Sequence, residues 1–368
     1  MPKTICIFSD GTGQGGAARA KTNTNVFTLY HAVKRADPVK QFAFYDPGLG
    51  SYRDGAEVGW GRWLQNMLSQ ATGLGISRNI KDCYGALVKV FEPGDRLFLF
   101  GFSRGAYTVR SLGGVLRLCG VPLRDAKGRS PRKNRDARLA LVHEAVETVY
   151  KTYGRDTASQ EKRRALGREF RQRYASVEVA PDFIGVWDTV RALGLPGTGD
   201  IFLWRHEFHD ATLDERVPCA RHAVAIDEER DAFAPVLWEE TPADRADGRI
   251  KQMWFAGVHS DIGGRYPERD LSDIALQWIA DEAEACTTPL LIDRTRLNLH
   301  PDPAGLQHDE LSTSWMPWRR GLRRLTERDT VAPAVEERFK APAVRFVDGE
   351  RPYRPMGLRG HPAFRDLY

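Results

Sequence analysis

The chain has 368 residues, of which 42% are apolar and 28% charged. This balance is typical of a folded globular protein and excludes a disordered chain. The length accommodates one large α/β domain or two smaller ones. The net charge of +5 is modest, and its excess of basic residues lies in Arg124–Arg173 and Arg319–Arg328. Such stretches suit an anionic membrane surface or a phosphate-rich partner, although they are also common on solvated helix faces.

The cysteines and the N-terminus indicate where the chain is made. The five cysteines lie far apart without a C-x-x-C pair, which excludes zinc-ribbon spacing. Their odd number within apolar segments predicts reduced thiols and synthesis in the cytosol. No signal peptide precedes the first apolar run, and no run reaches membrane-spanning length. We expect a protein that is cytoplasmic as synthesised, and any export would use a route that reads no Sec-type signal.

Strands and helices alternate in the first third of the chain. Short apolar runs predict strands at Lys3–Phe8, Gln41–Tyr45 and Arg96–Phe100. Apolar residues at helical spacing predict helices that begin near Asn23, cover Trp60–Ala71 and Ile76–Phe91, and include Val109–Leu118. This β-α-β-α-β-α order predicts a parallel sheet covered by helices on both faces.

Residues 123–175 interrupt the alternation. This segment is rich in Arg and Lys and predicts two helices, near Ala137–Thr152 and Ser159–Tyr174. We interpret it as a helical insertion between sheet elements. It could serve as a lid over the site or as an ordinary crossover pair of helices.

The sheet is expected to resume after the insertion. Strands are predicted at Pro181–Trp187 and Lys251–Val258, Cys219–Ile226 is either helix or strand, and Ser272–Glu284 is predicted to be helical. Residues 289–368 show few clear elements, so we expect them to wrap around the domain. The predicted fold class is α/β, a single domain over residues 1–368 with a mostly parallel central sheet, helices on both faces and a helical insertion.

The pentapeptide from Gly101 to Gly105 carries the strongest chemical signal. Gly101-Phe102-Ser103-Arg104-Gly105 fits G-x-S-x-G and lies between a predicted strand and a predicted helix. That context is the one a nucleophile elbow requires, because a sharp turn there lifts the serine hydroxyl clear of the sheet. The backbone N–H of Arg104 would then face a developing oxyanion. In the alternative interpretation, Ser103 is only the N-cap of the helix.

A glycine-rich loop follows the first strand. Gly11–Gly16 literally matches the dinucleotide fingerprint G-x-G-x-x-G. A polar stretch separates it from the next helix, so a dinucleotide-binding oxidoreductase is a weak interpretation. The loop could instead offer backbone N–H groups to an anion. We expect Gly11 and Thr12 to supply the second oxyanion donor, with Asp10 beside them at the oxyanion and substrate-binding site; a permissive surface turn is the alternative.

Residues of catalytic type follow four predicted strands: Asp10, Ser103, Asp188 and His259. The carboxyl ends of parallel strands share one edge, where ligands bind. The order Ser, Asp, His is that of α/β-hydrolases. An imidazole accepts the serine proton, and a carboxylate holds the imidazole in the correct tautomer.

Several other residues compete for these roles. His222 is the main alternative to His259, and His206 and His209 are weaker ones. Asp261 could orient His259 or bind its loop, so we place it in a supporting position around the catalytic residues.

Longer motifs carry a family resemblance. SDGTG, YDPGLG, GFSRGAYTVR, GVWDTV, HAVAIDEERDAF, WFAGVHSDIGG and LSDIALQW occur in this order between about Thr4 and Ile279. With these motifs the chain resembles the α/β-hydrolase domain of type VI secretion phospholipase effectors. The resemblance implies an α/β-hydrolase-like fold, a triad at Ser103, Asp188 and His259, and hydrolysis of phospholipid acyl esters. Those effectors are usually longer and carry extra membrane-contacting segments, whereas this chain has only the insertion and a modest tail.

The sequence therefore predicts a serine carboxylester hydrolase, phospholipase-like, with no cofactor and no metal. The expected partners are an ester or phospholipid substrate, a membrane surface touched peripherally, and a secretion-system or immunity protein; nucleic acid is not expected. One alternative is a metal-dependent phosphoesterase with Asp10, Asp188, His259 and Asp261 as ligands. Another is a catalytically inactive binding module that keeps the hydrolase fold.

Overall fold

The structure is a computed structural model that describes residues 2–11, 22–48, 73–152, 156–190, 212–312 and 318–368. Several features predicted from the sequence lie outside these ranges. They are the glycine-rich loop after Gly11, with the possible oxyanion donor Thr12, the helix at Trp60–Ala71, and the two weaker histidine candidates, His206 and His209.

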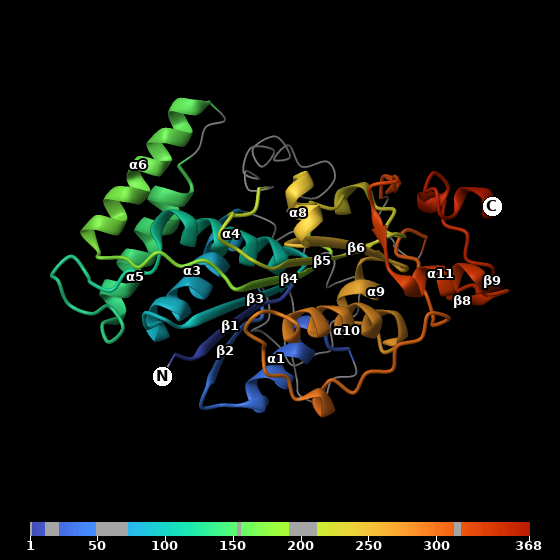
Figure 1. Cartoon of the computed structure of the whole chain (residues 1–368), viewed down its shortest axis with the longest axis horizontal. Coiled ribbons are helices and arrows are strands. Elements are labelled where there is room, and N and C mark those ends of the chain that lie inside the picture. Colours follow the sequence, from blue (N-terminus) through green and yellow to red (C-terminus); the bar gives the residue numbers. More distant parts are fainter. Residues whose placement is uncertain (1, 12–21, 49–72, 153–155, 191–211, 313–317) are drawn as a thin grey trace.

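A parallel sheet forms the centre of the described fold, which confirms the predicted α/β class (Figure 1). Its seven strands have the order β2-β1-β3-β4-β5-β6-β7, and every neighbouring pair is parallel. The strands are β1 (Thr4–Ser9), β2 (Gln41–Asp46), β3 (Arg96–Phe102), β4 (Phe183–Trp187), β5 (Ala220–Ala225), β6 (Ile250–Phe255) and β7 (Thr330–Val331). The ambiguous segment Cys219–Ile226 is therefore strand β5.

Both faces of the sheet are buried, as the unbroken apolar runs predict. In β1, Ile5 and Ile7 pack into one hydrophobic cluster, whereas Cys6 and Phe8 pack into the other. The first cluster lies under α3 (Gly73–Val90) and α4 (Arg104–Cys119), and the second under α1 (Asn25–Ala36) and α10 (Asp270–Glu284). Two short helices, α8 (Pro242–Asp247) and α9 (His259–Gly263), flank β6 in the chain.

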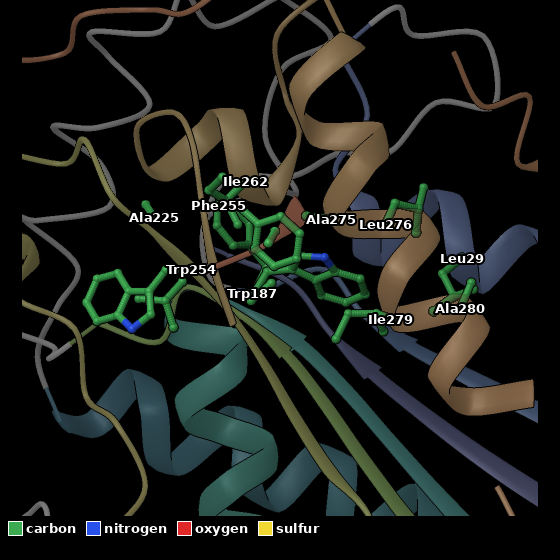
Figure 2. Close-up of a cluster of buried hydrophobic side chains, with 14 of the residues drawn as sticks. Leu29, Trp187, Ala225, Trp254, Phe255, Ile262, Ala275, Leu276, Ile279 and Ala280 are labelled. Atoms are coloured by element: carbon green, nitrogen blue, oxygen red, sulfur yellow. The ribbon is translucent and has the colours of Figure 1, made fainter. Parts of the chain in front are cut away.

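Figure 2 shows part of the cluster on the α10 side. Trp187 from β4 and Phe255 from β6 lie beside Ile262 of α9 and Ile279 of α10. All four side chains are buried. Since Trp187 immediately precedes Asp188, this packing fixes the point at which Asp188 leaves the sheet.

The segment interpreted from the sequence as a helical insertion contains helices. It consists of α5 (Arg135–His143), a π-helix (Glu144–Tyr150) and α6 (Thr157–Arg173). It packs against α3, where Lys81 Nζ lies 2.9 Å from Glu147 Oε1 and Lys151 Nζ lies 3.0 Å from Ser77 Oγ. Figure 1 shows α6 at the margin of the fold, beyond α5 and α3. A lid role for this insertion stays a prediction.

The C-terminal segment is more ordered than the sequence predicts. It supplies β7 at the edge of the sheet, α11 (Pro333–Lys340) and a hairpin of β8 (Val344–Phe346) and β9 (Gly349–Arg351). Short 3-10 helices lie at Asp231–Phe233, Arg294–Arg296, Met356–Leu358 and Arg365–Leu367. Buried tail residues such as Phe339 and Leu358 join the α10-side cluster.

The cysteines and the helices can also be compared with what the sequence predicts for thiols and membrane spans. All five cysteines lie in the described ranges, and each is a free thiol. Within those ranges, no helix combines the length and apolar character that a membrane crossing needs.

Candidate active site

The order of the strands has a topological switch point between β1 and β3. β2, the next strand in the chain after β1, pairs on one side of β1, and β3 pairs on the other side. The direction in which strands are added to the sheet therefore reverses between β1 and β3. Ligands of open α/β sheets bind beyond the carboxyl ends of the strands at such a point. Gly11 follows β1 and Ser103 follows β3, and a Cβ added to Gly11 would lie 3.6 Å from the Ser103 Cβ. Ser103 therefore lies at this switch point.

The backbone at Ser103 makes a sharp strand-to-helix turn. Its φ of 58° and ψ of −121° are rare for a residue with a side chain and store local strain. The turn depends on Gly105, since a Cβ there would lie 2.0 Å from the Ser9 carbonyl oxygen. Ser103 occupies the N-cap position of α4, but its side chain makes no capping hydrogen bond to the helix.

Asp188 and His259 meet at the same edge of the sheet. Asp188 directly follows β4 and His259 begins α9 after β6, and both side chains are fully buried. His259 Nδ1 lies 2.6 Å from Asp188 Oδ2, while the Ala225 N–H donates to Asp188 Oδ1 at 3.1 Å. The imidazole therefore carries its proton on Nδ1, as the carboxylate partner requires, and Nε2 is left as an acceptor.

Aromatic rings enclose the His259 imidazole. Its centroid lies 4.6 Å from the ring of Phe102 and 5.1 Å from that of Phe233. Burial lowers the pKa of His259 below its ordinary value, although Asp188 acts in the opposite direction. A neutral imidazole next to the residue that precedes Ser103 is suited to act as a general base.

The serine hydroxyl and the second imidazole nitrogen, Nε2, have no hydrogen-bond partner in the described structure. Ser103 Oγ and His259 Nε2 are both buried and unpaired, so they do not bond to each other in this conformation. The backbone nevertheless ties the two regions together, because the Ser103 N–H donates to the Trp187 carbonyl at 3.1 Å. Catalytic hydrogen bonds are often unformed until substrate binds.

Sequence reasoning missed Arg323, which binds the carboxylate of Asp188. Its two terminal nitrogens lie 2.7 Å from Asp188 Oδ1 and 3.0 Å from Oδ2. Burial by itself would raise the pKa of Asp188, but Arg323 and His259 outweigh it and hold this pKa well below its usual range. The sequence signal that could have indicated Arg323 is the basic stretch Arg319–Arg328. Taken alone, this stretch indicates only anionic partners or a solvated helix face.

Gly11 does not match the expected oxyanion donor. Gly11 N–H donates to Asp10 Oδ1 at 2.7 Å, so this amide is already used. Asp10 is itself buried and accepts from the hydroxyls of Thr24 at 2.5 Å and Tyr45 at 2.7 Å. Burial raises its pKa to about 6. In this conformation Asp10 holds the loop in place, and Gly11 does not offer the donor assigned to it.

Asp261 and His222 both support segments next to the proposed catalytic residues. Asp261 Oδ1 lies 2.7 Å from His308 Nδ1 and its Oδ2 accepts from the Val258 N–H at 3.1 Å, so it binds the loop and does not orient the His259 ring. His222 Nε2 accepts from the Thr189 N–H at 3.1 Å. Burial lowers the pKa of His222 to about 3, and its neutral ring supports the turn after Asp188.

The side chain of Arg104 is a buried cation beside the nucleophile position. Its Nε and Nη2 have no hydrogen-bond partner in the described structure. Burial lowers its pKa to about 9, so the guanidinium is still charged at neutral pH. Since an unpaired buried charge is costly, this position favours an anionic group nearby.

The four residues considered as metal ligands all form hydrogen bonds to protein groups. Asp10 binds Thr24 and Tyr45, Asp261 binds His308, and Asp188 pairs with His259. Within the described ranges, no three His, Cys, Asp or Glu side chains are grouped as metal ligands would be.

Known proteins are similar to this chain in sequence. A family model described as "T6SS, Phospholipase effector Tle1-like, catalytic domain" matches residues 3–282. An uncharacterised protein of Saccharomyces cerevisiae, YEL023C, is 29% identical over 248 residues, which are 65% of this chain and 33% of that protein.

Two solved structures are similar to the chain. The first is an uncharacterised protein from Pseudomonas aeruginosa, with a TM-score of 0.45 and 20% identity over 80% of this chain and 47% of that one. The second is the Tle1 effector bound to the VgrG spike of the type 6 secretion system, with a TM-score of 0.36 and 18% identity over 72% and 51%. The chain thus spans between a third and about half the length of these proteins. Because the family model covers most of it, including Ser103, Asp188 and His259, the chain belongs to the type VI secretion phospholipase effector Tle1-like catalytic domain family.

Proposed function

We propose that this protein is a serine carboxylester hydrolase that cleaves acyl esters of phospholipids. Ser103 would be the nucleophile, His259 the general base, and Asp188 the residue that holds the base. The observation that carries the proposal is the buried 2.6 Å contact between Asp188 and His259, beside a strained serine whose hydroxyl is unpaired.

The geometry supports the following reaction. Ser103 Oγ attacks the ester carbonyl carbon while its proton passes to His259 Nε2, and Asp188 stabilises the resulting imidazolium. The carbonyl oxygen becomes an oxyanion that accepts from the Arg104 N–H, which has no intrahelical acceptor because it begins α4. His259 then gives the proton to the leaving alcohol. A water molecule, activated in the same way, releases the fatty acid and restores Ser103.

Two observations favour a phospholipid over a neutral ester. The family to which the chain belongs is described as phospholipase effectors. The buried guanidinium of Arg104, directly after Ser103, would also gain a partner from the substrate phosphate. On the family description we further propose export by a type VI secretion system, with a component of that system as partner.

The test uses purified protein, a fluorophosphonate probe and a panel of phospholipids and short-chain esters. The wild type should take up the probe and hydrolyse phospholipid, and Ser103→Ala should do neither. Ser111→Ala, a buried serine in the same helix, is the matched control and should keep both activities. Labelling or hydrolysis by Ser103→Ala equal to wild type would exclude Ser103 as nucleophile. A folded wild type that takes up no probe would favour the inactive binding module.

A further inference from the structure

We propose that Arg323 is a positioning residue of the active site, delivered by the C-terminal segment, which holds Asp188 in place and balances its charge. The inference rests on the proposed function, because it assigns a role around the same catalytic aspartate. It adds a residue that lies beyond the 3–282 span of the family match.

The contacts of Arg323 are those of a fixed two-pronged clamp. Nη1 lies 2.7 Å from Asp188 Oδ1 and donates to the Ala225 carbonyl at 2.7 Å. Nη2 lies 3.0 Å from Asp188 Oδ2 and donates to the Phe233 carbonyl at 2.5 Å. The side chains of Arg323 and Asp188 are 4% and 0% exposed, so water does not screen the pair. Each terminal nitrogen therefore joins the carboxylate to a backbone that lines the site.

The backbone on both sides of Arg323 is attached to the body of the fold. Before it, the Gly321 N–H donates to the Glu229 carbonyl at 2.7 Å. After it, the Leu325 N–H donates to the Gly357 carbonyl at 3.0 Å. Gly357 packs so closely that a Cβ there would lie 2.5 Å from the Arg323 carbonyl oxygen. These backbone contacts of the C-terminal segment thus fix the position of the Arg323 guanidinium.

Asp188 needs such a partner for two reasons. Its backbone φ of 32° is unfavourable for a residue with a side chain, so its position must be maintained by its contacts. Its carboxylate is also fully buried, and burial favours the neutral acid, which could not stabilise an imidazolium. Arg323 answers both needs, because its planar fork fixes the carboxylate and its charge keeps it ionised.

The charges around His259 predict how the site responds to the loss of Arg323. Asp188 Oδ2 bonds to the imidazole, whereas Glu228 Oε2 accepts from the backbone N–H of His259 at 3.3 Å. Both carboxylates favour the charged imidazolium. Arg323 offsets the first carboxylate, and Arg230, 2.6 Å from Glu228 Oε2, offsets the second. Arg230 also lies 2.8 Å from Glu310. Without Arg323, the uncompensated charge of Asp188 would stabilise the imidazolium, or Asp188 would itself take up a proton. Either change moves the pH at which the base becomes active upward.

The experiment compares Arg323→Met, Arg323→Lys and the exposed neighbour Arg324→Met in the full chain. Arg323→Met should lower kcat/KM for ester hydrolysis by about tenfold to a hundredfold through misplacement of the catalytic pair. The acid limb of its pH profile, the range in which kcat/KM falls as the pH is lowered, should move up by about one pH unit. Arg323→Lys keeps the charge without the fork, so kcat/KM should fall severalfold while the limb stays at the wild-type pH. Arg324→Met should match the wild type in both respects.

The outcomes separate this inference from the proposed function. If Ser103→Ala is inactive while Arg323→Met keeps the wild-type rate and acid limb, the positioning role is wrong and the nucleophile assignment stands. If Ser103→Ala remains active, the proposed function itself fails. Thermal melting establishes that each variant is folded. Should Arg323→Met not fold, Arg323→Lys decides the matter, because an unchanged kcat/KM in that variant would overturn the need for a two-pronged contact.

Discussion

Asp188 Oδ2 lies 2.6 Å from His259 Nδ1, although the two residues are 71 positions apart in the chain. Both side chains have no exposed surface. A buried carboxylate in this position fixes which imidazole nitrogen carries the proton, and it leaves the other nitrogen free to accept one. The predictions below follow from this pair and from the serine turn beside it.

Asp188→Asn should lower kcat by about 10³- to 10⁴-fold, because an amide can hold His259 in the wrong tautomer. Asp261→Asn is the matched control, since Asp261 binds His308 and the loop instead of the His259 ring. We expect its kcat to stay close to that of the wild type. Steady-state ester hydrolysis measures both variants, and equal losses would contradict the distinct roles of the two aspartates.

Ser103→Gly should be more stable than Ser103→Ala by about 1 kcal/mol, because glycine adopts the backbone conformation of this turn without strain. Urea unfolding of the two inactive variants gives the difference in the free energy of unfolding. Ser111, inside helix α4, provides the opposite case, since glycine there should be less stable than alanine by about 1 kcal/mol. If Ser103→Gly were no more stable than Ser103→Ala, the turn would not store strain.

The acid limb of kcat/KM should lie below about pH 6.5, the ordinary pKa of a histidine. The base must be neutral to accept the serine proton. Burial lowers the pKa of His259, so the ring loses its proton at a lower pH than a free imidazole does, and activity persists there. The rate of fluorophosphonate labelling as a function of pH reports this limb, and thermal melting shows whether the protein stays folded in acid. A limb at or above pH 6.5 would contradict the expected direction.

Arg104→Met should weaken hydrolysis of a phospholipid more than hydrolysis of a neutral short-chain ester, by about tenfold in kcat/KM. The reason is that a substrate phosphate would lose the Arg104 guanidinium, whose Nε and Nη2 have no partner in the described structure, whereas a neutral ester has no phosphate. A monomeric short-chain phospholipid keeps membrane binding out of the comparison. Arg78→Met, at an exposed position of α3, is the charge-matched control and should alter neither rate. Equal losses on both substrates would assign Arg104 to folding or to the turn.

The local patterns of the sequence were sufficient to predict most of the sheet and the serine turn. Apolar runs marked β1, β2 and β3 to within a few residues. For β1 and β3 the reason is that a strand buried on both faces needs a continuous apolar segment. Other elements had no such signal. Strand β7 has two residues, too few to show a period, and β5 contains Arg221 and His222, which obscured its apolar character.

Part of the chemistry of the site could likewise be predicted from the sequence, and part could not. The types and order of Ser103, Asp188 and His259 could be read from strand ends, because parallel strands bring their carboxyl ends to one edge. The partner of each polar group could not. Whether Gly11 offers its amide depends on where the Asp10 carboxylate turns, and only the fold shows that the two are bonded.

The amino-acid sequence by itself determined the α/β class, the strained turn at Ser103 and the residue types that a hydrolase requires, since these depend on neighbours along the chain. Only the tertiary structure decided that one arginine of the basic stretch Arg319–Arg328 leaves the solvent and clamps Asp188. Charge along a sequence does not tell an exposed cation from a buried one. That difference arises when distant segments pack together and a buried carboxylate needs a partner.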